Sequence, residues 1–298
     1  MDLHELQYFI AIAREGNITR AARQLYVSQP TLTKYLQRLE AQVGVPLFQR
    51  TGRQLVLTYA GQRYLARAEE LLSLERALEA ELADIRGEDT GELRVGMPPV
   101  RCSFSLPQVL PRFRQMHPNV RLRILEDASE ALDTALCAGQ VDLNFYNFSV
   151  PDPRLEYRVL SHDAIYAVLP KGHPAGRQAA EKNGERELPL SCLAGETFLL
   201  QKRTQRQGQY LYDLMRRQQV TPRQIQVTTN IRAAFALAVN GYGVAFISSG
   251  LLRHLEAGAA FDRYRLAGGP ALDFVAAWRK GSYLPGYAQN LIALMQQV

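Results

Sequence analysis

Residues 16–58 read GNITRAARQLYVSQPTLTKYLQRLEAQVGVPLFQRTGRQLVLT and combine the pattern of two short helices with that of a basic hairpin. Asn17 is a candidate N-cap for a first helix, whose buried side is marked by small alanines. Ser28 is a candidate N-cap for a second helix, and Pro30 is tolerated in its first turn. The stretch therefore predicts a helix-turn-helix.

The second helix has apolar side chains three and four residues apart, which predicts that this side faces a core. Leu32, Leu36, Leu39 and Val43 form that row. Its N-terminal end is where a recognition helix reaches base edges. Glutamine there can pair with adenine, and threonine can contact phosphate or a thymine methyl. A solvated amphipathic helix is the alternative. We expect DNA contacts from Ser28, Gln29, Pro30, Thr31, Thr33, Lys34 and Arg38.

A hairpin pattern follows the second helix. Residues 45–57 read as two short strands around Thr51 and Gly52, with Arg50 and Arg53 near the tip. A wing of this kind commonly contacts phosphate or the minor groove, although two arginines at a tip are also ordinary surface charge. Together with the helix pair, the hairpin predicts a winged helix-turn-helix in which Arg50 and Arg53 contact DNA.

Charge is distributed unevenly along the chain. The 298 residues are enough for two or three domains, 47% of them are apolar, and the net charge is +6. Residues 1–63 hold eight basic and four acidic residues, whereas residues 64–90 hold three basic and eight acidic ones. A basic N-terminal part followed by an acidic segment is the distribution expected of a DNA-binding head.

Several other classes of protein are disfavoured by what the sequence lacks. No signal peptide and no apolar run of membrane-spanning length is visible, so we expect a cytoplasmic protein without a membrane partner. Cys102, Cys137 and Cys192 are far apart and odd in number, so we expect neither a metal site nor a disulfide framework. No recognisable catalytic motif occurs, so we expect no enzymatic activity and no cofactor.

Residues 58–86 contain no proline and one glycine, which predicts a long helix with Thr58 as its N-cap. Its apolar side chains follow a heptad seam that needs a partner. Packing on its own domain is the alternative, but the acidic outer face favours a solvated dimerisation helix. The seam consists of Tyr64, Ala68, Leu71, Leu78, Leu82 and Ile85, interrupted by Glu75 and widened by Leu65 and Leu72. Residues 87–91 read as a hinge.

From Glu92 onward, strands alternate with helices, which predicts a parallel α/β domain. The expected strands are residues 93–96, 120–125, 141–145, 164–169, 198–201, 225–228, 244–247 and 274–278. The expected helices are residues 106–116, 130–138, 209–219, 231–240 and 287–296.

The N-terminal motifs resemble the DNA-binding domain of the LysR-type transcriptional regulators. The pair Ile18 and Thr19 departs from the serine-containing pair that is common there. The matching residues are Ala21-Ala22, Leu25, Ser28-Gln29-Pro30, Leu39-Glu40, Gly44, Leu47-Phe48, Arg50, Arg53, Leu57-Thr58 and Ala60-Gly61. The remainder is similar to the effector domain of the same family, through LRVG at 93–96, HPNVRL at 117–122, VLPKGHPA at 168–175 and AVNGYGVAFI at 238–247.

This resemblance implies a multidomain fold. An all-α winged helix-turn-helix at 1–58 and a linker or dimerisation helix at 59–89 would precede an effector-binding α/β domain at 90–298. That domain would be similar to type 2 periplasmic binding proteins. Subdomain I would comprise about residues 91–160 and 267–298, and subdomain II about 161–266. The two crossing strands would lie near 147–160 and 266–274.

The family resemblance also implies partners. We expect a homodimer, assembling further into a homotetramer, that binds double-stranded DNA of approximate dyad symmetry. A small-molecule co-inducer would shift the population between two arrangements of the subdomains, and RNA polymerase would be a further partner.

Ligands of such domains bind at the carboxyl ends of strands, where helix N-termini point inward. The family often has a serine or threonine early in the first such loop, where this chain has prolines, a valine and an arginine. Basic residues in these loops favour an anionic effector, although residues 202–206 also fit a solvated surface run. The expected effector-binding residues are Pro99, Val100, Arg101, Ser103, Ser129, Asn147, Lys202, Arg203 and Asn230.

Three alternatives stay open at this point. A cysteine, Cys102 or Cys137, would make the chain a redox-responsive regulator. An enzymatic α/β domain fused to a DNA-binding module is the second alternative. A solute-binding protein is the third, and the basic N-terminal head argues against it.

Overall fold

A computed structural model describes residues 3–52, 54–147, 151–255, 260–269 and 272–298. The chain divides into two compact units. The N-terminal unit contains residues 1–88 with the short segments 137–140 and 282–284. The α/β unit contains residues 89–136, 141–281 and 285–298.

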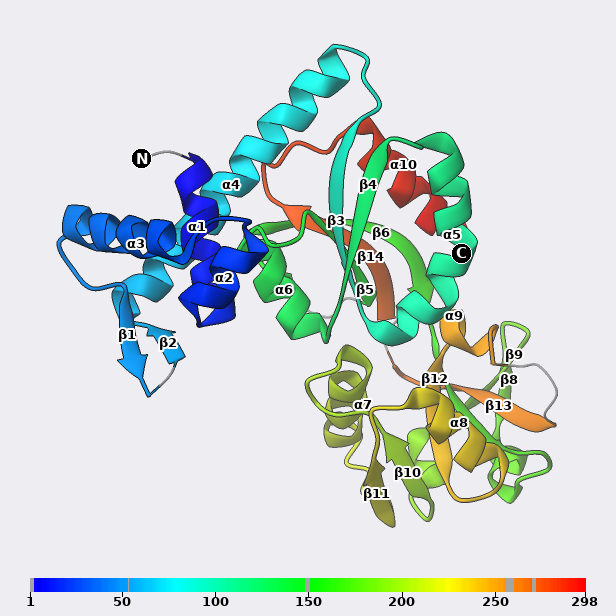
Figure 1. Cartoon of the computed structure of the whole chain (residues 1–298). Coiled ribbons are helices and arrows are strands. Elements are labelled where there is room, and N and C mark those ends of the chain that lie inside the picture. The colour runs from blue at the N-terminus through cyan, green and yellow to red at the C-terminus, as the bar shows by residue number, and fades with distance from the viewer. Residues whose placement is uncertain (1–2, 53, 148–150, 256–259, 270–271) are drawn as a thin grey trace. The chain divides into compact units, whose positions relative to one another are not determined.

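The N-terminal unit is a winged helix-turn-helix followed by a long helix (Figure 1). Its elements are α1 (Leu3–Glu15), α2 (Ile18–Gln24), α3 (Gln29–Val43), β1 (Phe48–Thr51), β2 (Gln54–Leu57) and α4 (Tyr59–Ile85). The three predicted N-caps are confirmed, because the side chains of Asn17, Ser28 and Thr58 accept backbone N–H bonds at the starts of α2, α3 and α4.

The core of this unit lies between α1, α2, α3 and the hairpin. Leu32, Leu36 and Leu39 of α3 are buried there, as the apolar row predicted. Val43 is exposed, so its predicted burial is wrong. It is the last residue of α3, and Gly44 then ends the helix in the left-handed conformation (φ 79°).

In the α/β unit, one mixed sheet has five strands in the order β4-β3-β5-β14-β6. β3 runs parallel to β4 and β5, as the alternation of strands and helices predicted, whereas β14 runs antiparallel to β5 and β6, so the sheet is mixed. The strands are β3 (Gly91–Met97), β4 (Val120–Glu126), β5 (Leu143–Asn147), β6 (Leu155–Asp163) and β14 (Leu272–Arg279). Its helices are α5 (Pro99–Met116), α6 (Ser129–Cys137) and α10 (Gly286–Met295).

A second mixed sheet has seven strands in the order β11-β10-β12-β7-β13-β9-β8. Those strands are β7 (Ile165–Pro170), β8 (Ala180–Lys182), β9 (Glu185–Leu188), β10 (Thr197–Leu200), β11 (Gln224–Val227), β12 (Val244–Ser248) and β13 (Phe261–Leu266). The helices of this part are α7 (Arg206–Arg217), α8 (Ile231–Val239) and α9 (Ser249–Leu252), with the 3-10 turns η1 (Pro174–Gln178) and η2 (Leu190–Leu193).

The chain passes between the two sheets twice. Ala164 separates β6 from β7, and the second passage lies between the end of β13 at Leu266 and the start of β14 at Leu272. The first passage is therefore further along the chain than the expected range of 147–160. Two starts also differ from expectation: α5 begins at Pro99 instead of 106, and α7 begins at Arg206 instead of 209. Both shifts change which side chains lie in the first turns of these helices.

None of the described helices is both long enough and apolar enough to cross a membrane. Over the same residues, no group of three or more His, Cys, Asp or Glu side chains is arranged to hold a metal ion.

Candidate functional site

The N-terminal end of α3 presents the predicted DNA-contacting residues. Ser28 Oγ accepts the Thr31 N–H at 3.3 Å and lies 2.7 Å from Thr31 Oγ1. Thr33 Oγ1 donates to the Gln29 carbonyl at 3.0 Å, and Gln29 Nε2 donates to Thr33 Oγ1 at 3.3 Å. Ser28 and Thr33 therefore fix the first turn of the helix. Gln29, Pro30, Thr31 and Lys34 are exposed. We call residues 28–34 the recognition end.

The two predicted arginines of this unit that the structure describes differ in their contacts. Arg38 forms an ion pair with Glu5 of α1, so its charge is shared within the unit. Arg50 is exposed on β1, opposite Leu55 of β2. The third predicted arginine, Arg53, lies outside the described residues.

The wing is held against α3 by a side chain from that helix. Glu40 Oε1 accepts the backbone N–H groups of Leu47 at 2.7 Å and Phe48 at 3.0 Å. Gly61 permits the close approach of α4, since a Cβ at this position would lie 1.9 Å from the Leu47 carbonyl oxygen. The start of β1 is therefore fixed by contacts with both α3 and α4.

The turn between α2 and α3 contains an aromatic side chain that the sequence reasoning missed. Tyr26 is 98% exposed and adopts a positive φ of 56°, a conformation that is uncommon for a residue with a Cβ. It lies two residues before Ser28 and thus beside the recognition end. The available signal was an aromatic residue in the turn, outside the apolar row of either helix.

α4 has two different halves. Ala68 and Leu72 are buried against Leu6 and Ile10 of α1, so the packing alternative holds for the first half. The second half carries apolar side chains that are 37–74% exposed and recur at heptad spacing. These residues, which we call the exposed stripe, are Leu71, Leu74, Leu78, Leu82 and Ile85.

A cleft of about 440 Å³ lies in the α/β unit and is lined from both of its sheets. The ends of β4, β5, β10 and β12 and the first turns of α5, α6, α7, α8 and α9 reach it, as expected for ligand sites of α/β domains. Five of the predicted effector-binding residues line it, namely Pro99, Val100, Arg101, Ser129 and Asn147. The cleft is also lined by residues that the sequence did not predict, including Phe104, Tyr146, Gln205, Arg206 and Gln207.

Four predicted effector-binding residues do not line this cleft. Because α5 already begins at Pro99, Ser103 lies on another side of the helix, where its hydroxyl donates to the Val100 carbonyl at 2.7 Å. Asn230 caps α8 by accepting two backbone N–H bonds. Lys202 is exposed, and the Arg203 guanidinium lies 4.3 Å from the centre of the Tyr212 ring. The sequence prediction placed the start of α7 too late. Because this helix begins at Arg206, residues 205–207 line the cleft.

Arg101 is 5% exposed, and its guanidinium is bound by other side chains of the protein. Its Nη2 donates to Asp163 at 3.1 Å and to Asn147 Oδ1 at 3.0 Å. The guanidinium also lies 3.8 Å from the centre of the Phe274 ring. Burial lowers the pKa of Arg101, and the neighbouring Asp163 opposes that effect. The positive charge is therefore compensated at the cleft wall by a buried carboxylate.

Asp163 is the last residue of β6, directly before the first passage between the sheets. Its Oδ2 accepts from Arg101 and from Asn147 Nδ2 at 3.0 Å. Its Oδ1 accepts from the Ser249 hydroxyl at 2.8 Å and the Gly250 N–H at 3.1 Å. This crossing cluster of Arg101, Asn147, Asp163 and Ser249 joins α5, β5, β6 and α9 where the chain changes sheet.

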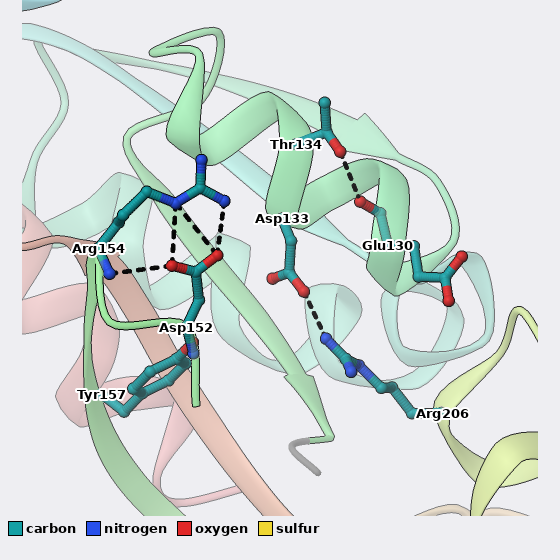
Figure 2. A network of polar contacts seen from close by, with 7 residues as sticks. All are labelled: Glu130, Asp133, Thr134, Asp152, Arg154, Tyr157 and Arg206. Atoms are coloured by element: carbon teal, nitrogen blue, oxygen red, sulfur yellow. Dashed lines mark hydrogen bonds and ion pairs between the residues drawn. The ribbon is translucent and has the colours of Figure 1, made fainter. Parts of the chain in front are cut away.

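A second ion pair lies at the cleft. Arg206, the first residue of α7, pairs with Asp133 of α6, as Figure 2 shows. Tyr146 is 1% exposed, and its ring centre lies 5.9 Å from the Arg206 guanidinium. Burial, and after it a hydrogen bond with the Asp133 carboxylate, raises the pKa of the Tyr146 phenol, which therefore stays protonated at neutral pH. The pair connects helices that belong to different sheets.

The redox alternative finds little support at Cys102. Burial raises the pKa of this thiol to about 12, and its Sγ lies 3.7 Å from the Met97 carbonyl oxygen. A protonated, buried thiol is unreactive at neutral pH. Cys137 and Cys192 are half-buried.

Comparison with known proteins agrees with this architecture. Residues 3–62 match the family described as bacterial regulatory helix-turn-helix protein, lysR family. Residues 86–298 match the LysR substrate binding domain. The Hca operon transcriptional activator HcaR of Escherichia coli (strain K12) is 30% identical over 303 residues, which cover 100% of this chain and 98% of that protein.

Solved structures share the fold. A full-length OxyR from Pseudomonas aeruginosa superimposes with a TM-score of 0.76 at 21% identity, covering 100% of this chain and 94% of that one. Full-length CbnR complexed with its target DNA gives a TM-score of 0.53 at 25% identity, covering 100% of this chain and 99% of that one. With two family matches that together span nearly its whole length, the chain belongs to the LysR family of transcriptional regulators.

Proposed function

We propose that this LysR-type regulator binds double-stranded DNA through the recognition end and the wing, and that a small molecule in the cleft modulates this binding. The observation that carries the proposal is the presence on one chain of an exposed recognition end and a cleft lined from two connected sheets. CbnR, a structural neighbour, is described in complex with its target DNA, which supports the first part. A cytoplasmic location belongs to the same proposal, because a regulator of this kind acts on DNA there.

Each predicted DNA-contacting residue that the structure describes has a role that its surroundings support. Gln29 and Thr31 are exposed where side chains of a recognition helix reach base edges. Lys34 and Arg50 are accessible cations suited to phosphate. Ser28 and Thr33 position the first turn of α3, Pro30 is its second residue, and Arg38 is anchored by Glu5. We retain Arg53 as a phosphate contact from its place near the tip of the wing sequence.

The exposed stripe of α4 is the proposed dimerisation surface. Five apolar side chains at heptad spacing on one solvent-exposed helix favour a second helix of the same kind as their partner. A dimer carries two recognition ends, and its target would have approximate dyad symmetry. Further assembly into a tetramer and contact with RNA polymerase belong to the same proposal.

The cleft is the proposed effector site. Because two chain passages connect the sheets, a ligand that contacts both can favour one arrangement of the sheets over another. Pro99, Val100, Ser129 and Asn147 are the proposed contacts retained from the sequence, and Arg101 acts by fixing the cleft wall through Asp163. The expectation of an anionic effector rested on arginines that are ion-paired here and on residues outside the cleft.

A selection experiment tests the proposed function. The full-length chain is incubated with a library of random duplexes, and bound sequences are enriched and sequenced. We expect one motif with approximate dyad symmetry, and we expect Gln29→Ala to change preference at one position of each half-site. Enrichment of no motif, or of an identical motif with the variant, would contradict the proposed use of the recognition end.

A further inference from the structure

The arginines of the cleft are already neutralised. Arg101 pairs with Asp163 and Arg206 pairs with Asp133. The other charged residues among those that line the cleft are acidic, Glu126 and Asp127. The two arginines, their partners Asp163 and Asp133, and the two further acidic residues are six charged groups. Two positive and four negative charges give a net charge of −2. An anionic ligand would enter a site where acidic groups outnumber basic ones.

Three polar atoms at the cleft are buried: the Tyr146 hydroxyl, which has the Asp133 carboxylate as a hydrogen-bond partner, Asp133 Oδ1 itself, and Gln205 Oε1, which has no partner among the described residues. Tyr146 and Gln205 line the cleft, and Asp133 is held beside it by Arg206. Two of these atoms are acceptors, and the phenol both donates and accepts. Buried polar atoms normally have a hydrogen-bond partner. The hydrogen bond between the Tyr146 phenol and Asp133 leaves Gln205 Oε1 without one. This wall of the cleft therefore offers hydrogen-bond acceptors to a ligand that donates.

The rest of the cleft suits an apolar body. Apolar side chains that line it include Val100, Phe104, Ile231 and Leu251. The first turns of α5 and α7 lack side-chain caps, so their free N–H groups can bond one acceptor atom of the same ligand. A ligand with an apolar body and a donating polar group fits both walls.

Building on the proposed effector role of the cleft, we propose that it selects an effector that has no net negative charge. This effector presents an N–H or O–H group, as an amine or an alcohol does, to Asp133 and Tyr146. Asp133 then has two roles: it neutralises Arg206 and it accepts a hydrogen bond from the ligand. The Asp133–Arg206 pair thus excludes carboxylate ligands of the same shape, because such a ligand would have to displace Asp133 from Arg206.

Thermal shift of the full-length chain with matched probes tests this selectivity. Three series share their apolar bodies, both aromatic and aliphatic, and differ only in the polar group: primary amine, primary alcohol or carboxylate. We expect an amine or alcohol to bind at least tenfold more tightly than the carboxylate of the same body. Tighter binding of the carboxylate would overturn the inference and leave the effector role of the cleft intact. Absence of binding in all three series would contradict both.

Two substitutions sharpen the test. Asp133→Asn frees Arg206, so the preference should reverse by at least tenfold in favour of the carboxylate. Tyr146→Phe removes one hydroxyl and should weaken the best amine or alcohol at least threefold, while the carboxylate series is unchanged. The control is Asp152→Asn, which removes the exposed Asp152–Arg154 pair of Figure 2 and lies outside the residues that line the cleft. An unchanged preference in Asp133→Asn, or the same reversal in the control, would overturn the assignment to Asp133.

Discussion

In the N-terminal unit, Gln29 and Thr31 expose polar groups to solvent, whereas in the α/β unit Arg101 and Asp163 bond to each other and are almost fully buried. The first kind of side chain is available to an external partner. The second kind is available only if an internal contact breaks. Arginine and lysine residues near a site therefore do not by themselves indicate anion binding, because an internal carboxylate can already hold their charge. Substitutions in the two regions should accordingly affect different properties.

The largest expected effect is on stability, from Asp163→Ala in the crossing cluster. Removing this carboxylate leaves the buried Arg101 charge uncompensated, a loss that costs about 3–5 kcal/mol in comparable buried pairs. Urea unfolding followed by the single tryptophan, Trp278, reports on this unit, because Trp278 lies on β14 of the five-stranded sheet. If the free energy of unfolding fell by less than about 1 kcal/mol, the usual value for an exposed pair, Asp163 would behave as a surface residue does. That result would contradict the difference drawn between the two units.

The next effect concerns assembly and the exposed stripe. Leu78 is 57% exposed, so Leu78→Asp should leave the fold of the protomer intact. It should abolish the dimer at micromolar concentration, because a charge would be buried in an apolar helix interface. Sedimentation velocity measures the change, and Glu79→Asp is a matched control on the same helix. A Leu78→Asp protein that sediments as the wild type does would exclude the stripe as the dimer interface.

A smaller effect is expected at the wing. Arg50→Ala should lower the slope of log affinity against log salt by about 0.9, the value for one phosphate contact. The free energy of unfolding should change by less than about 0.5 kcal/mol, as for most surface substitutions. Anisotropy titrations of a labelled duplex at several salt concentrations give the slope. An unchanged slope would place Arg50 outside the DNA interface.

The smallest effect concerns an exposed ion pair of the α/β unit. Hydrogen bonds from the Arg154 side chain lower the pKa of Asp152 from 3.8 to about 2. Because the folded-state pKa is lowered, the pair stabilises the fold above about pH 4, and this contribution is lost as the pH falls towards 2. An NMR titration of the Asp152 carboxyl should show a midpoint near 2 that rises towards 4 in Arg154→Ala. A midpoint near 4 in the wild type would contradict the pairing.

Sequence reasoning succeeded where the determining contacts are local. Asn17, Ser28 and Thr58 cap helices through bonds to residues three positions away, and such spacings are visible in a sequence. The cleft depends on pairs that are distant in sequence. Arg101 and Asp163 are separated by 62 positions, and Arg206 and Asp133 by 73, so no local pattern indicated that these charges compensate each other.

Helix starts account for most of the remaining error. α5 and α7 both begin earlier than their apolar periodicity suggested, because their first turns pack at the cleft and contain polar or proline residues. This shift moved Ser103 away from the cleft and brought Gln205 and Arg206 into it. Lys202 and Arg203, which lie before the start of α7, stayed outside.

In the proposed function, a ligand in the cleft controls DNA binding by the recognition end. The most direct test is an anisotropy titration of a selected duplex with the full-length chain, with and without the tightest-binding probe of the thermal-shift series. We expect the probe to change the DNA affinity of the wild type at least threefold. In Tyr146→Phe we expect unchanged affinity without the probe. Because this variant binds the probe at least threefold more weakly, the same probe concentration, chosen below the wild-type Kd, should change its DNA affinity by less than twofold. A probe effect of equal size in both proteins would contradict this control by the cleft.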